Sequence, residues 1–141
     1  MHTEHLQNVR VRWVLVGWLI AVAVASLLAL ALASFGLLTA TAEGGTAWAT
    51  LAVVIGFLAG GLFTGVRAAE APILHGVAIG LFSILAAFVL NLLALLLFES
   101  PPYATLSVTA GLTLIFAQVV AAVLGAWSGY TYARRGGELE V

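Results

Sequence analysis

Four long apolar stretches dominate the chain, and the polar residues gather in the segments between them. The stretches cover about residues 14–38, 48–66, 73–98 and 106–130. A helix needs about 20 apolar residues to cross roughly 30 Å of hydrocarbon, and each stretch is near or above that length. The pattern therefore predicts four transmembrane helices in one membrane domain, residues 14–130, with tails at 1–13 and 131–141.

The only other structure that spans a bilayer is a closed β-barrel. Barrel strands alternate apolar and polar residues, and runs such as Leu27–Leu32 and Leu92–Phe98 show no alternation. Links between the stretches are short, and Pro101-Pro102 prevents the third helix from continuing. Short links make consecutive helices antiparallel neighbours. We therefore expect an all-α polytopic membrane protein, a four-helix bundle made of two antiparallel hairpins.

Composition supports a membrane protein and excludes several function classes. Hydrophobic residues make up 63% of the chain and charged residues 8%, whereas soluble proteins carry about 25% charged residues. The net charge of −1 offers no basic surface for nucleic acid. The chain has no cysteine, which rules out disulfides, thiolate metal sites and cysteine nucleophiles.

Arginine placement predicts how the chain is oriented. With four spans, both tails and the link between the second and third helices lie on one side of the membrane. All five basic residues fall on that side: Arg10, Arg12, Arg67, Arg134 and Arg135. The two links on the other side carry Glu43 and Glu99. The positive-inside rule therefore places both termini in the cytoplasm.

The second and fourth predicted helices share a sequence motif. Gly61 and Gly65, with Arg67 soon after, match Gly125 and Gly129, with Arg134 soon after, at an offset of 64 residues. One interpretation is a duplicated helical hairpin, with both copies in the same orientation, as in some transporters. The other is that small and aromatic residues recur in any membrane helix.

Small residues give the strongest local signal. Helices in lipid associate where glycine or alanine lets their backbones approach closely. The first helix carries alanines at four-residue spacing: Ala21, Ala25, Ala29 and Ala33. The candidate helix-packing glycines are Gly56, Gly60, Gly61, Gly65, Gly76, Gly80, Gly125 and Gly129. They predict either packing within this bundle or an interface to other copies or another membrane protein.

Four polar residues are candidates for burial within the membrane: Asn91, Gln118, Thr109 and Thr113. Such groups form interhelical hydrogen bonds or line the path of a small polar permeant. No charged residue lies inside any of the four stretches. Ion-coupled carriers and proton relays normally need one, so this absence argues against them.

His75 is the one histidine close to a membrane segment and the only candidate ligand residue. It would hold a pigment or haem, or it would simply hydrogen-bond to water or a carbonyl group. We expect no cofactor beyond that option and no metal site. The chain has no carboxylate pair in a pocket, no serine–histidine arrangement and no phosphate-binding loop, so we expect no enzymatic activity.

Two motifs carry a resemblance to a known family. The segment Gly60-Gly61-Leu-Phe-Thr-Gly65-Val-Arg67, followed by His75-Gly76-Val-Ala-Ile-Gly80, resembles an uncharacterised bacterial family of small four-helix membrane proteins. That resemblance implies four helices, the topology above and a bacterial inner or intracytoplasmic membrane. It implies no activity, because the family has none established.

Three functions remain open from the sequence. The first is a non-catalytic accessory subunit that packs against other transmembrane proteins in a larger complex, for example a photosynthetic or respiratory one. The second is a homo-oligomeric channel or facilitator for a small solute. The third is a pigment- or haem-binding membrane protein using His75. In each case the partners are the lipid bilayer and other transmembrane segments, from other subunits or from copies of the chain.

Overall fold

The computed structural model describes residues 9–38, 44–68, 71–97 and 108–138. Within these ranges it holds no strand and four helices: α1 Val11–Ser34, α2 Gly45–Ala68, α3 Pro72–Leu97 and α4 Val108–Glu138. Each helix contains a segment long and apolar enough to cross a membrane. The predicted all-α fold with four membrane-spanning helices is confirmed.

The first helix ends before its apolar stretch does. After Ser34, Gly36 adopts a φ of +73°, which a residue without a side chain reaches at no steric cost. The N–H of Gly36 donates to Ala33 and that of Leu37 to Leu32, with N···O distances of 2.9 and 3.0 Å. This pair of bonds is a Schellman motif, which satisfies carbonyl groups left free at a helix end. The left-handed backbone conformation of Gly36 therefore ends α1, although the residues beyond it are still apolar.

Several residues used to predict the links lie outside the described ranges, namely Glu43, Glu99, Pro101 and Pro102. The fourth helix is longer than its apolar stretch. It passes Tyr130 and continues through the two terminal arginines to Glu138.

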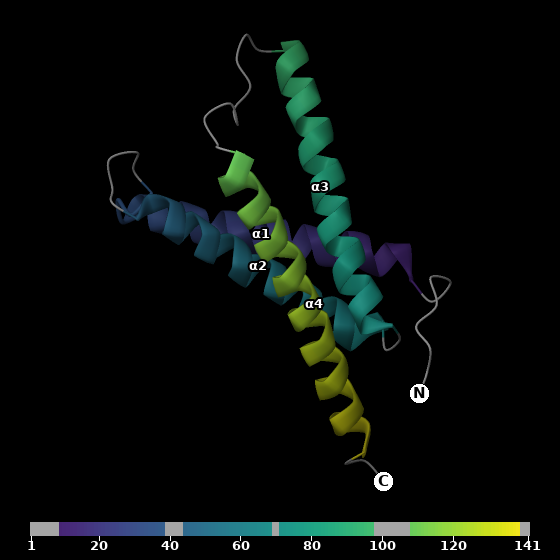
Figure 1. Ribbon diagram of the computed structural model, residues 1–141. Coiled ribbons are helices and arrows are strands. Elements are labelled where there is room, and N and C mark those ends of the chain that lie inside the picture. The colour runs from purple at the N-terminus through teal and green to yellow at the C-terminus, as the bar shows by residue number, and fades with distance from the viewer. Residues whose placement is uncertain (1–8, 39–43, 69–70, 98–107, 139–141) are drawn as a thin grey trace.

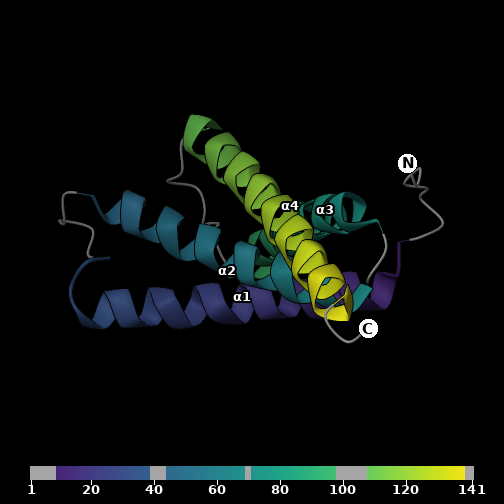
Figure 2. The same ribbon diagram turned by 90° about the horizontal axis from the view of Figure 1, so that it is seen from below.

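The two hairpins cross one another steeply. Figure 1 shows α1 and α2 lying together, with α3 and α4 laid across them. Seen from below, α4 passes over α2 while α1 stays on the far side of α2 (Figure 2). The contacts between α2 and α4 are the most extensive in the fold, followed by those between α1 and α2. The central element is therefore the α2–α4 crossing, and α1 and α3 flank it.

Packing concentrates at one end of the bundle, which we call the arginine end. It consists of the starts of α1 and α3 and the ends of α2 and α4 (Figure 1). The core cluster belongs to this half of the molecule: Val14, Ala21, Phe57, Ile79, Ala121 and Ala122. Toward the opposite end the hairpins diverge, and long apolar side chains are exposed on α1 and α3.

Candidate functional site

Two glycines of α2 sit against the backbone of α4. A Cβ atom added at Gly61 would overlap the carbonyl oxygen of Ala122, and one added at Gly65 would overlap that of Ala126. Both alanines are fully buried. The two helices run in the same direction here, because both positions advance together along each chain. Only glycine permits this approach, since a backbone carbonyl cannot swing aside as a side chain can.

Glycines of α4 likewise sit against the backbone of α2. A Cβ added at Gly125 would overlap the carbonyl oxygen of Leu58, and one added at Gly129 would overlap that of Leu62. The offset of 64 residues that relates Gly61 to Gly125 also relates Leu58 to Ala122. The crossing is thus reciprocal, as in the interface of a two-fold symmetric dimer. This geometry supports the interpretation that the chain contains a duplicated hairpin.

A second seam joins α2 to α1. A Cβ added at Gly56 would lie 2.5 Å from the oxygen of Ala21 and 2.7 Å from the Cβ of Ala25. One added at Gly60 would meet the oxygen of Gly17 and, at 2.8 Å, the Cβ of Ala21. The first half of the predicted alanine stripe therefore packs on glycines of α2. Its second half extends toward the exposed end of α1.

A third seam joins α3 to α4. A Cβ added at Gly76 would lie 2.5 Å from the Cα of Val123, and one added at Gly80 would lie 2.6 Å from the Cγ2 of Val119. All eight candidate glycines are thus placed at contacts between helices of this one chain. They are occupied internally, so they do not provide a free face for an outside partner.

Thr64 is a buried polar residue that the sequence did not single out. Its side chain is fully buried, and its hydroxyl donates to the carbonyl of Gly60 at 2.9 Å. The same hydroxyl lies 3.2 Å from the carbonyl of Trp13, at the start of α1. A threonine that bonds four residues back in its own helix leaves no trace in the hydrophobic pattern.

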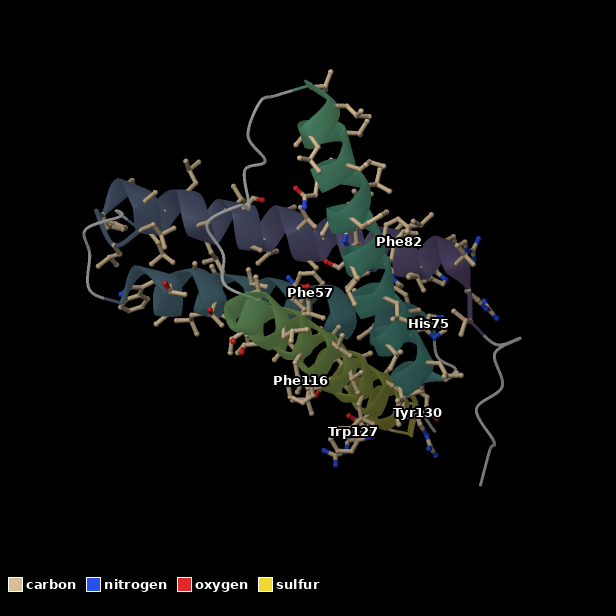
Figure 3. All side chains as sticks on the ribbon, turned by 45° about the horizontal axis from the view of Figure 1, so that its top comes forward. Phe57, His75, Phe82, Phe116, Trp127 and Tyr130 are labelled. Atoms are coloured by element: carbon tan, nitrogen blue, oxygen red, sulfur yellow. The ribbon has the colours of Figure 1, made fainter. Side chains whose placement is uncertain are left out.

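His75 is fully buried where α3 begins, beside the start of α1 (Figure 3). Its Nδ1 lies 3.0 Å from the carbonyl oxygen of Ala71. A carbonyl only accepts, so Nδ1 carries the proton and Nε2 is the acceptor. Nε2 accepts a hydrogen bond from the backbone N–H of Arg10 at 3.1 Å. The ring thus joins the starts of α1 and α3 and satisfies the N-cap residue of α1, whose own side chain makes no capping bond.

This arrangement bears on the haem and pigment hypothesis. A metal would bind a ring nitrogen through its lone pair, and the free lone pair of His75 lies on Nε2. Coordination there would require the hydrogen bond from Arg10 to break. Among the described residues, no group of three histidine, cysteine or acidic side chains is placed to hold a metal ion.

The four predicted buried polar residues do not converge. Gln118 of α4 accepts a hydrogen bond from Ser83 of α3, with an O···O distance of 3.3 Å. Thr113 donates to the carbonyl of Thr109 in its own helix, on an exposed face. Asn91 is half-buried, and its Oδ1 has no hydrogen-bond partner. Within the described residues they therefore do not line a common path.

Aromatic side chains also connect the helices at the arginine end. Trp13 packs edge-on against Phe63, and Trp18 against Phe82, so α1 is held to both α2 and α3. Guanidinium groups lie over three rings within cation–π range: Arg12 over Trp13, Arg67 over Phe63 and Arg134 over Tyr130.

Comparisons with protein-family models, with curated proteins and with solved structures found no match to this chain. The resemblance to the bacterial four-helix family therefore stays a prediction.

Proposed function

We propose that this chain is a non-catalytic integral membrane protein that serves as an accessory subunit in a larger membrane complex. The observation that carries the proposal is the uneven packing of its helices. Glycine and alanine contacts hold the arginine end together, while many long apolar side chains are exposed on the opposite halves of α1 and α3. Such a molecule is tightly packed at one end. At its other end, helix surfaces are available to other transmembrane segments.

The exposed surfaces suit helix association. Leu96 and Leu97 at the end of α3 are 74% and 73% exposed, and Leu30 of α1 is 69% exposed. Lipid can cover such side chains, so exposure alone does not select a protein partner. The divergence of the two hairpins adds a reason, because a further helix would gain dispersion contacts with more than one element.

The competing functions find less support in the geometry. A homo-oligomeric channel needs polar groups that are free to line a path for the solute, and Gln118 is instead paired with Ser83 between two adjacent helices of one chain. The centre of the bundle is filled by close backbone contacts between α2 and α4. Haem binding at His75 would disrupt the link between α1 and α3.

Purification tests this proposal directly. The tagged chain, extracted from its native membrane in mild detergent, is expected to migrate with at least one other transmembrane protein in fixed stoichiometry. Native electrophoresis and mass spectrometry of the band measure this. A chain that migrates alone, as a monomer or a homo-oligomer, contradicts the accessory role. Visible absorbance would favour a pigment or haem protein, and saturable solute flux in liposomes would favour a channel.

We also propose that both termini face the cytoplasm of a bacterial cell, in the inner or an intracytoplasmic membrane. Single cysteines can test the orientation because the chain has none of its own. Thr46→Cys at the start of α2 and Gly136→Cys near the end of α4 are both at exposed positions. In intact cells an impermeant thiol reagent should label Thr46→Cys and label Gly136→Cys only after lysis. Labelling of both variants in intact cells would refute the orientation.

A further inference from the structure

Two guanidinium groups at the arginine end lie over a pair of aromatic rings that pack against each other. The ring of Trp13 in α1 meets that of Phe63 in α2 edge-on, with 6.2 Å between the centroids. The guanidinium carbon of Arg12 lies 5.0 Å from the centroid of the Trp13 ring, and that of Arg67 lies 6.0 Å from the centroid of Phe63. Two cations from different helices are therefore gathered around one ring pair, and we call these four residues the Arg12–Arg67 cluster.

The rings hold the two cations without using their hydrogen-bond donors. A guanidinium over a ring is attracted by the π electrons, while its N–H groups point outward in its own plane. Both arginine side chains are exposed, and every charged side chain that the structure describes is an arginine, so no described carboxylate pairs with them. A guanidinium matches a phosphate group, which accepts two parallel hydrogen bonds from it. The cluster therefore suits a ligand that carries phosphate oxygens.

The backbone that carries Arg12 and Trp13 is anchored on both sides. The N–H of Arg10 donates to Nε2 of the buried His75 in α3 at 3.1 Å. The carbonyl of Trp13 accepts a hydrogen bond from the hydroxyl of Thr64 in α2 at 3.2 Å. The start of α1 is thus fixed against two other helices before any ligand binds. A preformed site loses less conformational entropy on binding than one that must be assembled.

The cluster lies where two apolar helices reach the membrane surface. Arg12 is the second residue of α1, and Arg67 is the last but one of α2. Exposed apolar side chains continue from Arg12 along the same face of α1, at Leu15, Val16 and Leu19, which are three, four and seven residues further on. Cations at headgroup depth with an apolar stripe leading inward match a molecule that has an anionic head and acyl chains.

We propose that the Arg12–Arg67 cluster binds the phosphate of an anionic phospholipid, whose acyl chains lie along Leu15, Val16 and Leu19 of α1. Basic sites beside transmembrane helices recognise anionic headgroups through this charge complementarity. A zwitterionic lipid brings its own cation close to its phosphate and gains less from the two arginines. Free phosphate has no acyl chain to cover the stripe. The inference does not depend on the accessory role or on which side the termini face.

Lipid titration of the purified full chain in detergent tests the proposal, with native mass spectrometry as the measurement. The two probes are phosphatidylglycerol and phosphatidylcholine with the same acyl chains, and the first should bind several times more tightly. Arg12→Gln should lower the affinity for phosphatidylglycerol about five-fold, which corresponds to about 1 kcal/mol for a basic residue near a membrane surface. Its affinity for phosphatidylcholine should stay the same. Equal affinity of the wild type for the two lipids would overturn the proposal.

Arg135→Gln is the matched control. Arg135 is exposed near the end of α4, at the same end of the bundle but outside the cluster. This change removes the same charge and should leave the preference for phosphatidylglycerol in place, and an equal loss would show that net charge rather than the cluster attracts the lipid. Arg67→Gln repeats the test from α2 should Arg12→Gln not fold. Inorganic phosphate at the concentration of the lipid should not displace phosphatidylglycerol, and displacement would reveal a site for free anions instead.

Discussion

Gly65→Leu is expected to destabilise the protein more than any exposed substitution, because Gly65 touches the backbone of α4 directly. A Cβ there would overlap the carbonyl of Ala126, and the rest of the leucine would add further volume at the crossing. Overpacking costs about 1–3 kcal/mol and occasionally more, and a contact with backbone belongs at the upper end of that range. Thermal unfolding of the purified variant in detergent should show a clearly lower midpoint, or the variant should fail to accumulate as a folded monomer.

Gly111→Leu is the matched control. It makes the same exchange within α4, and an added Cβ at Gly111 would have nothing within 4 Å. Leucine also favours a helix more than glycine does, by nearly 1 kcal/mol. This variant should unfold at or slightly above the wild-type midpoint. Equal behaviour of the two variants would mean that the α2–α4 crossing does not exist as described.

The reciprocal geometry extends this prediction to the other helix. Gly129 meets the backbone of α2 as Gly65 meets that of α4, so Gly129→Leu should be as harmful as Gly65→Leu. A large difference between the two would show that the crossing is not symmetric in energy, even though its contacts repeat at a constant offset.

The helices and the importance of glycine were predictable, but the helix that each glycine faces was not. Gly60 and Gly61 are adjacent, so they point about 100° apart around α2. Gly60 meets α1 and Gly61 meets α4. The pattern of small residues indicates that two other helices can pack closely against α2. It does not show which helix packs against which glycine. That choice depends on contacts between segments far apart in the chain, such as Gly60 with Gly17 and Gly61 with Ala122.

The polar residues illustrate the same limit. Counting residues from the helix ends puts Gln118 and Ser83 at a similar depth, and the structure pairs them. The same counting puts Asn91 level with Thr109 and Thr113, yet Thr113 bonds within its own helix instead. Depth follows from counting residues, whereas a hydrogen bond also requires the two side chains to face each other. Facing depends on how each helix is rotated, which the crossing contacts decide.

His75→Ala is expected to cost about 2–4 kcal/mol, because it removes a fully buried ring and the hydrogen bond that this ring accepts from Arg10. The sequence left open a hydrogen bond from this histidine to water or to a carbonyl group, and the structure shows the bond to the carbonyl of Ala71. The ring is buried because the start of α1 packs over the start of α3, a contact that no local pattern near His75 reveals. Unfolding in detergent should therefore begin at a lower temperature, with α1 less firmly held.

His75→Gln separates this structural role from ligand binding. A glutamine amide can donate to Ala71 and accept from Arg10, so it should recover most of the stability that His75→Ala loses. It is also a poor replacement for histidine as a ligand to haem iron. If the wild-type protein carries visible absorbance that disappears in a fully stable His75→Gln variant, the imidazole serves a cofactor. If His75→Gln is as unstable as His75→Ala, the two hydrogen bonds are not what the ring contributes. Recovery of stability with no spectral change supports the structural role, in which His75 fastens the two hairpins together at the arginine end.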